Sequence, residues 1–178
     1  MKKSLADMAR SLGLMAVIVA GLLFVGARYL IMPGSADRMP AADYSSELQS
    51  FPRLAGVPVL APTGLPSSWR ANAARLSSPA AGATQLHIGW ALPGSRYAGL
   101  DEATGTPDTL LTSVLGARGR TVTGTTTIDG VSWQQRVSAL GEEALTRQVG
   151  RLTVVITGNA SDGQLRQLAA SLRQSSLR

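Results

Sequence analysis

His87 is the only histidine in this chain of 178 residues, and it is the side chain best suited to acid–base chemistry. A lone histidine can act as a general base, as a metal ligand, or as the middle member of a hydrolase triad. Zinc sites need three or four ligands at local spacing, and the chain has no cysteine. No serine lies in the Gly-x-Ser-x-Gly pattern of a nucleophile elbow. We therefore expect His87 at the surface or rim of a strand.

This pattern predicts no catalytic, metal-binding or cofactor-binding residue, and no cofactor. A hydrolase built around His87 is the less favoured alternative. Two pairs of neighbouring carboxylates, Asp101-Glu102 and Glu142-Glu143, are the next candidates for acid–base chemistry. Neighbouring residues on a strand point to opposite faces of a sheet, so neither pair can form a catalytic dyad. We expect both pairs to be loop charges.

Three tryptophans stand out in a chain with only 4% aromatic residues. Trp69, Trp90 and Trp133 all fall in segments with strand character, and together they could line a pocket for a ligand or a partner. In a domain so poor in aromatic residues, such side chains more often anchor the core. Both interpretations stay open here. The threonines at positions 121, 123, 125 and 127 could likewise form a flat ligand surface, although such a row more often faces solvent.

A long apolar run near the N-terminus determines where these side chains work. Residues 12–32 contain one charged side chain, Arg28, whose guanidinium can reach the lipid headgroups. A helix of about 20 residues spans the hydrocarbon core of a bilayer. The run therefore predicts a transmembrane helix over residues 12–32, with the lipid bilayer as its partner.

The charges around this run predict its orientation. Lys2, Lys3 and Arg10 precede it, which places a cytoplasmic tail at residues 1–11 and the rest of the chain outside the plasma membrane. A single-pass protein with its C-terminal domain outside the cell follows. The alternative is a signal peptide cleaved near Ala27, which would give a secreted protein.

The exported part divides into a linker and one domain. Residues 33–56 contain three prolines with several alanines and serines, so we expect a tether with a short turn of helix that docks at Phe51 and Leu54. Residues 57–178 then form one extracytoplasmic domain, which is long enough for a hydrophobic core. Because cysteine is absent, packing alone must hold that domain together.

Strand signals dominate the domain. Apolar residues at positions 86, 88, 90 and 92 predict a strand with one buried face, and Pro93-Gly94 predicts a turn into a partner strand over residues 97–102. Asp129-Gly130 predicts a tight hairpin between strands at residues 120–128 and 131–137. Further strands are expected at residues 69–76, 144–149 and 152–157.

Two helices complete the predicted fold. Thr106 is expected to cap a helix that begins at Pro107 and stops at Gly116. Ser161 and Gln164 fit a capping box at the start of a second, leucine-rich helix. The domain is thus expected to be α+β, with an antiparallel sheet packed by one or two helices.

Charge gives little indication of a partner. From residue 33 onward, 13 arginines face 10 acidic residues, and the basic residues are spread along the chain. Nucleic-acid-binding domains concentrate their positive charge on one face or helix. We therefore expect no nucleic-acid partner, and instead expect an envelope or membrane protein.

The order of short motifs along the chain resembles a known family. After the apolar run come Gly64-Leu-Pro-Ser-Ser-Trp69, Leu86-His-Ile-Gly-Trp90, Asp129-Gly-Val-Ser-Trp133 and Val154-Val-Ile-Thr-Gly158, followed by the leucine-rich helix. This order resembles the actinobacterial single-pass membrane proteins of the domain of unknown function 4245 family. The resemblance implies a membrane-anchored extracytoplasmic domain of the cell envelope. It brings no catalytic residues to carry over.

Three functions follow as hypotheses. An anchored domain without a catalytic motif is typical of a non-catalytic protein-interaction module of the cell envelope. The first alternative is a ligand-binding module with a pocket between sheet and helices. The second is the extracytoplasmic hydrolase that would use His87. An acidic or hydroxyl partner beside His87 is the observation that a hydrolase requires.

Overall fold

The computed structural model describes residues 41–79 and 82–175, which form part of one compact unit. The expected cytoplasmic tail, the span at residues 12–32, the cleavage site near Ala27 and the first part of the linker lie outside these described residues. Among the helices that are described, none has the length and apolar character needed to cross a bilayer.

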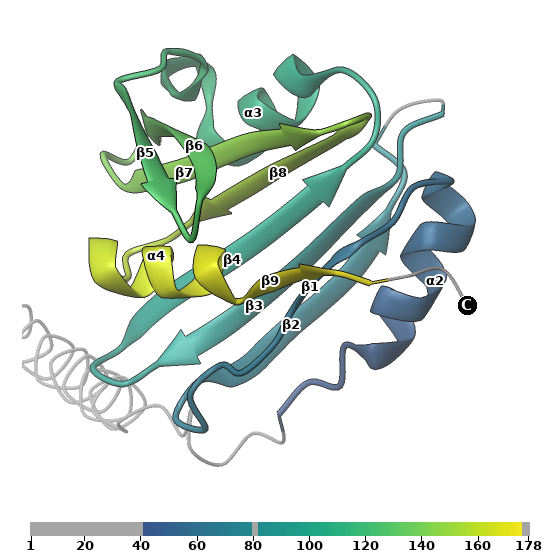
Figure 1. Ribbon diagram of the computed structural model, residues 1–178, viewed down its shortest axis with the longest axis horizontal. Coiled ribbons are helices and arrows are strands. Elements are labelled where there is room, and N and C mark those ends of the chain that lie inside the picture. Colours follow the sequence, from purple (N-terminus) through teal and green to yellow (C-terminus); the bar gives the residue numbers. More distant parts are fainter. Residues whose placement is uncertain (1–40, 80–81, 176–178) are drawn as a thin grey trace, which may run out of the picture. The chain divides into compact units, whose positions relative to one another are not determined.

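An antiparallel sheet of seven strands organises the domain (Figure 1). The strand order is β2-β3-β4-β8-β7-β6-β5. The α+β class and the antiparallel sheet that the sequence predicts are confirmed. The strands of this sheet are β2 (Arg70–Ser77), β3 (Gln85–Leu92), β4 (Arg96–Ala103), β5 (Gly124–Ile128), β6 (Val131–Val137), β7 (Glu143–Val149) and β8 (Leu152–Thr157).

One face of this sheet carries the main core. It is covered by α2 (Ser45–Ala55), by α4 (Asp162–Ser171), and by a short two-stranded ribbon made of β1 (Leu60–Pro62) and β9 (Leu172–Gln174) (Figure 1). The even positions of β3, from Leu86 to Leu92, point into this core, as their alternation predicts.

The capping box of α4 is confirmed. The side-chain Oε1 of Gln164 accepts hydrogen bonds from the Ser161 backbone N–H at 3.0 Å and from the Ser161 hydroxyl at 3.1 Å. This exchange satisfies a donor that the first helical turn leaves unpaired. The helix therefore begins where the sequence predicts.

The folded unit begins before residue 57, where the sequence placed its boundary. The segment expected to be a tether contains α2, an eleven-residue helix rather than a short turn. Phe51 is fully buried in the main core, whereas Leu54 is 66% exposed and does not dock as expected. The weak periodicity of residues 33–56 and the proline within the helix concealed it, although Phe51, Pro52 and Ala55 are buried.

The strand expected at residues 120–128 begins four residues later. A short 3-10 helix, η1 (Ala117–Arg120), precedes it, and β5 starts at Gly124. The Asp129-Gly130 hairpin turn is confirmed, with both residues at positive φ. The four threonines at 121, 123, 125 and 127 are exposed, which favours the solvent-facing interpretation of that row.

The opposite face of the sheet is only partly covered. Among the described helices, α3 (Pro107–Leu115) packs on this face, against β4 and β8, through a small cluster that includes Leu110, Leu111 and Leu115. The helix begins at Pro107 as predicted, but the Thr106 hydroxyl pairs with the Thr109 hydroxyl at 2.6 Å instead of capping a backbone N–H. Beyond α3, the strands β2 and β3 present their side chains on this face, which we call the open face.

Candidate functional site

A chain of polar side chains crosses the open face between β3 and β4. His87 lies directly opposite Asp101 in the register of the two strands. The Nδ1 atom of His87 lies 3.0 Å from Asp101 Oδ1, and Gln85 Nε2 donates to the same oxygen at 3.0 Å. The other ring nitrogen, Nε2, lies 3.0 Å from the Tyr97 hydroxyl. Because a carboxylate only accepts, His87 donates through Nδ1 and accepts the Tyr97 hydroxyl at Nε2.

Two glycines allow the Tyr97 ring to reach His87. Gly89 and Gly99 face each other across β3 and β4. A Cβ on Gly89 would lie 2.5 Å from the Tyr97 hydroxyl oxygen and 2.8 Å from Cε2, and one on Gly99 would lie 3.2 Å from Cε1. The two edges of the ring therefore lie over two different strands. The ring is flat against the sheet, and its hydroxyl is directed along the face toward His87.

The backbone of Tyr97 is held from the neighbouring loop. Its N–H donates to Asn159 Oδ1 at 2.6 Å, and its carbonyl accepts the Ala160 N–H at 3.0 Å. These bonds fix the start of β4 against the segment that precedes α4. Two glycines of the sheet therefore leave room for the ring. Hydrogen bonds from the segment before α4 fix the backbone of Tyr97.

Burial raises the pKa of the Tyr97 hydroxyl, and the nearby charge of Asp101 raises it further. Both effects disfavour the phenolate. Tyr97 therefore stays protonated and donates its hydrogen to His87. This arrangement therefore does not stabilise a nucleophilic phenolate.

A cavity of about 490 Å³ opens above this chain of side chains. Arg75 on the edge strand β2 lies opposite His87 in the register of β2 and β3, and it is exposed. Hydroxyl groups complete the lining from β2, α3 and β8, at Ser77, Ser113 and Thr157. The cavity thus combines one cation, the half-buried ring of Tyr97, and several donors and acceptors. These are the features of a site that binds a polar ligand.

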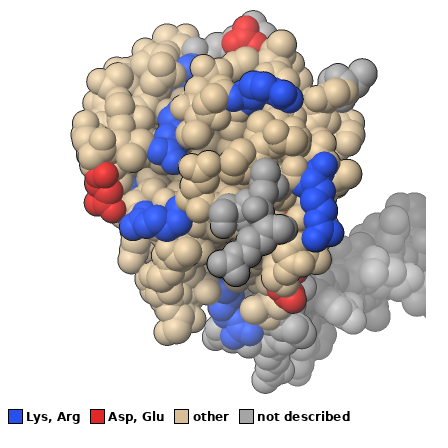
Figure 2. Space-filling model, turned by 45° about the vertical axis from the view of Figure 1, so that its right-hand side comes forward, with Lys and Arg blue, Asp and Glu red and all other residues tan. Residues whose placement is uncertain are grey.

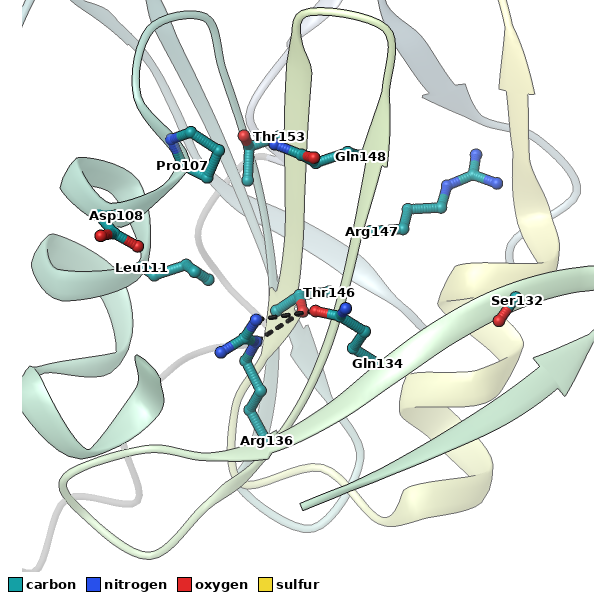
Figure 3. A pocket seen from close by; sticks show the side chains of 10 residues that line it. All are labelled: Pro107, Asp108, Leu111, Ser132, Gln134, Arg136, Thr146, Arg147, Gln148 and Thr153. Atoms are coloured by element: carbon teal, nitrogen blue, oxygen red, sulfur yellow. Dashed lines mark hydrogen bonds between the residues drawn. The ribbon is translucent and has the colours of Figure 1, made fainter. Parts of the chain in front are cut away.

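A second cavity on the same face, of about 410 Å³, lies between α3 and strands β6, β7 and β8 (Figure 3). Its central cation is Arg136, which donates to Thr146 Oγ1 at 2.9 Å, Gln134 Oε1 at 2.7 Å and the Gly119 carbonyl at 3.1 Å. Figure 3 shows this guanidinium directed at Thr146 and Gln134, while Arg147 points away. Because its donors are engaged within the protein, we interpret Arg136 as a structural connection between strands.

Glu102, the neighbour of Asp101, faces the opposite side of β4 and is fully buried in the main core. Its Oε2 accepts the Leu60 backbone N–H at 3.1 Å, whereas Oε1 has no hydrogen-bond partner among the described residues. Burial raises the pKa of this carboxyl to about 8, against the smaller opposing effects of the Leu60 hydrogen bond and of Arg147. The expectation that Asp101-Glu102 is loop charge is wrong, because both residues lie in β4 and both are buried.

The three tryptophans do not meet around a pocket. Trp69, Trp90 and Trp133 are all buried in the main core. Tyr44 packs edge-on against Trp90 with ring centroids 5.9 Å apart, and the Arg147 guanidinium lies 4.7 Å from the Trp133 ring centre. Their positions agree with the core-anchor interpretation, and the cavity lies on the other face of the sheet.

Sequence reasoning missed Tyr97, Arg75 and the two glycines. The signal was present in the alternation of β3 and β4. His87 and Gly89 occupy odd positions of one predicted strand, and Tyr97, Gly99 and Asp101 occupy odd positions of the next. Only the register of the hairpin brings these five residues together.

Within the described residues, charge and metal ligation add no further site. Figure 2 shows arginine side chains that lie apart from one another on the face in view, with few acidic residues between them. Within residues 41–79 and 82–175, no cluster of three or more histidine, aspartate or glutamate side chains is arranged to hold a metal ion. The Tyr97–His87–Asp101 chain is therefore the candidate site that the geometry supports.

Comparison with known proteins places the chain in a family. Neither a curated protein nor a solved structure matches it significantly. The model of a family described as "Protein of unknown function (DUF4245)" matches residues 1–172. This match extends over nearly the whole sequence, so it includes both the open face and the apolar run at residues 12–32. The chain therefore belongs to the DUF4245 family.

Proposed function

We propose that this protein is a membrane-tethered, extracytoplasmic binding module that recognises a polar ligand on the open face of its sheet without catalysing a reaction. The observation that carries this proposal is the cavity above Tyr97, His87 and Asp101, whose side chains are held in place by hydrogen bonds within the protein. Groups that are already oriented lose little conformational entropy when a ligand binds.

The location rests on the sequence. Residues 12–32 form an apolar run long enough for a bilayer helix, and the basic residues before it favour a cytoplasmic N-terminus. In this arrangement the ligand is part of, or is presented by, another component of the cell envelope. Fusions of a periplasmic reporter to either end of the chain test this orientation, because activity only at the C-terminal end is expected.

A surface for a large protein partner has less support. The exposed large apolar side chains of the described residues lie on α2, at Leu54, and within residues 122–149, and none of them lines the cavity. A protein interface usually contains an apolar centre with aromatic residues. The side chains around the cavity are mostly polar, which favours a small or extended polar ligand over a broad protein surface.

A hydrolase is the second candidate, because His87 has both an acidic partner, Asp101, and a hydroxyl partner, Tyr97. The order of carboxylate, imidazole and hydroxyl resembles that of a hydrolytic triad. The raised pKa of Tyr97 counts against it as a nucleophile, so His87 would have to activate water. Ester or amide hydrolysis that disappears in His87→Ala would favour this second candidate.

The first test uses the full-length protein in intact cells. Envelope components are crosslinked to the tagged chain, captured and identified, in parallel for wild type, Arg75→Ala and the matched control Arg151→Ala. Arg75 lines the cavity, whereas Arg151 is exposed at the turn between β7 and β8. We expect one component that wild type and Arg151→Ala retain and Arg75→Ala loses. Equal capture by all three proteins would contradict binding at the open face.

A further inference from the structure

We propose that the cavity of the open face binds a saccharide ring that carries a carboxylate, with the sugar stacked on Tyr97 and its carboxylate paired with Arg75. This inference rests on the proposed function and specifies the chemistry of its ligand. It is carried by three observations: the position of the Tyr97 ring, the groups that surround it, and the exposed guanidinium at the rim.

The Tyr97 ring is a flat platform. One face lies against Gly89 and Gly99, which leaves the other face directed away from the sheet and into the cavity. The face of an aromatic ring carries negative charge density, and it attracts groups with a positive edge. The C–H bonds on one side of a pyranose ring are such groups. A sugar laid parallel to Tyr97 would cover the ring without needing a deep pocket.

Polar groups surround the platform where the hydroxyls of a stacked sugar would project. Asp101 uses Oδ1 for its bonds to His87 and Gln85, and Oδ2 has no hydrogen-bond partner in the described part of the chain. Ser77 brings a hydroxyl group that can donate and accept, whereas the Thr157 hydroxyl donates to the Glu143 carbonyl and can accept. A sugar hydroxyl also donates and accepts, so it can match either kind of group. Where a sugar hydroxyl and a protein group lie too far apart for a direct hydrogen bond, a water molecule can bridge them.

Arg75 supplies the preference for a negative charge. Its side chain is exposed at the rim of the cavity, and no hydrogen bond or ion pair ties it to another residue within 41–79 and 82–175. Arginine binds carboxylates through two parallel hydrogen bonds. Asp101, the carboxylate that faces the cavity, is already bonded to His87 and Gln85. A carboxylate on the sugar would therefore bind at Arg75.

A nucleotide is the competing ligand, since a planar base also stacks on an aromatic ring. A base presents hydrogen-bonding groups only at its edge, in its own plane. The hydroxyl and amide groups of this cavity come from β2, β3, α3 and β8, so they surround a volume instead of one plane. A non-planar ring with hydroxyls on several carbons matches this arrangement better.

The experiment measures binding to the full-length protein in lipid nanodiscs. The probes are N-acetylglucosaminyl-N-acetylmuramic acid, which carries a carboxylate, its neutral counterpart chitobiose, and adenosine monophosphate. Saturation-transfer difference NMR identifies which protons of each probe contact the protein, and titration calorimetry gives the affinity. We expect the acidic disaccharide to bind with a dissociation constant near or below about 1 mM, through the protons of one ring face.

Four variants separate the contributions of the aromatic face and of the guanidinium. Tyr97→Ala is expected to weaken the acidic disaccharide at least about tenfold, and Tyr97→Phe less than about threefold, because phenylalanine keeps the stacking face. Arg75→Ala should weaken the acidic disaccharide about tenfold and leave chitobiose unchanged. Arg151→Ala should change neither. Because Arg75 is exposed, its variant tests the proposal even if Tyr97→Ala fails to fold.

Several outcomes would overturn the inference. They are binding of adenosine monophosphate alone, saccharide binding that Arg75→Ala and Tyr97→Ala leave unchanged, or no saccharide binding at about 10 mM. If these occur while capture from cells still depends on Arg75, the open face binds another ligand and the proposed function stands. If dependence on Arg75 is also absent from the capture experiment, both proposals fail.

Discussion

At the residue scale, the site depends on two glycines, which have no side chain, as much as on the side chains of Tyr97, His87 and Asp101. Gly89 and Gly99 provide the space in which the Tyr97 ring lies flat, so that its hydroxyl reaches His87. Neither glycine has a positive φ, so any residue could adopt its backbone conformation. Steric space above the sheet, and not backbone freedom, is what requires glycine here.

Gly89→Ala should therefore displace the Tyr97 ring. Its Cβ would lie 2.5 Å from the hydroxyl oxygen. We expect a loss of about 1–3 kcal/mol in the free energy of unfolding, as for other overpacked sites. Thermal and urea denaturation followed by circular dichroism measure this loss. Gly163→Ala is the matched control. A Cβ added at this position would have no atom within 4 Å, and alanine favours a helix.

A second pair of variants tests the cause of that loss. In a Tyr97→Ala background the ring is absent, so Gly89→Ala should cost much less than it does in the wild type. A double-mutant cycle gives the coupling between the two positions. If the cost of Gly89→Ala is the same in both backgrounds, the ring is not the neighbour that the glycine accommodates.

Glu102 is the residue that should make stability depend on pH. Its folded pKa, about 8, lies above its ordinary value of 4.5, because burial disfavours the charged form. The folded state therefore holds the proton more tightly than the unfolded state. The stability that this group contributes is complete below pH 4.5 and is lost as the pH rises to about 8.

Glu102→Gln should remove this part of the pH dependence, because the amide is neutral and can still accept the Leu60 N–H. We expect wild type to lose stability relative to the variant as the pH rises from 4.5 to about 8. Urea denaturation at a series of pH values measures the difference between the two proteins, which cancels the titration of other groups. A difference that does not vary with pH would show that Glu102 has an ordinary pKa.

At the scale of secondary structure, Arg136 connects three elements that the sequence treats separately. It lies on β6, and it donates to Thr146 on β7 and to the carbonyl of Gly119 in η1. This side chain is only 8% exposed. Its bond to Gly119 holds the 3-10 turn of residues 117–120 against the sheet, so residue 120 belongs to this turn and not to the strand predicted from there.

Arg136→Met should release η1 from the sheet. Methionine has a similar length but cannot donate to Thr146, Gln134 or Gly119. We expect a loss of about 2–4 kcal/mol, since buried acceptors are left unpaired. Hydrogen exchange should increase most in residues 117–123. Arg151→Met, at an exposed turn, should change stability by less than about 0.5 kcal/mol. Equal exchange in both variants would exclude Arg136 as the connection.

At the scale of the whole molecule, α2 belongs to the domain and not to a flexible tether. Its Phe51 packs into the same core as Trp90 and the leucines of α4. The carbonyl of Ala71 in β2 accepts the Ala42 N–H at 2.8 Å, so the chain contacts the sheet even before the helix starts. Along the sequence the domain therefore begins by Ala42, which leaves fewer residues than 33–56 for a tether after the proposed membrane helix.

Phe51→Ala and Leu54→Ala distinguish a docked helix from a tether. The two residues lie on the same helix, but Phe51 is fully buried and Leu54 is 66% exposed. We expect Phe51→Ala to lower the free energy of unfolding by about 3–5 kcal/mol and Leu54→Ala to change it by less than about 0.5 kcal/mol. Urea denaturation monitored by tryptophan fluorescence measures both. Similar small effects would mean that α2 is not part of the cooperative fold.

Local patterns in the sequence were sufficient for the elements with strong local signals. The alternation of β3, the Asp129-Gly130 turn and the capping box of α4 each depend on residues that are close along the chain. The burial of Phe51 was expected, but the start of β5 and the length of α2 were not predictable in this way. They depend on Arg136 and Phe51, whose partners are distant in sequence.

The sequence by itself determined the α+β class, the antiparallel strands and the family to which the chain belongs. It also drew attention to His87, the single histidine, but without showing what surrounds it. Tertiary structure alone decided that Asp101, Tyr97 and Arg75 lie beside this ring, while the three tryptophans lie in the core on the other face. The physical reason is register, because pairing two strands selects which side chains become neighbours, and a shift of one residue would separate them.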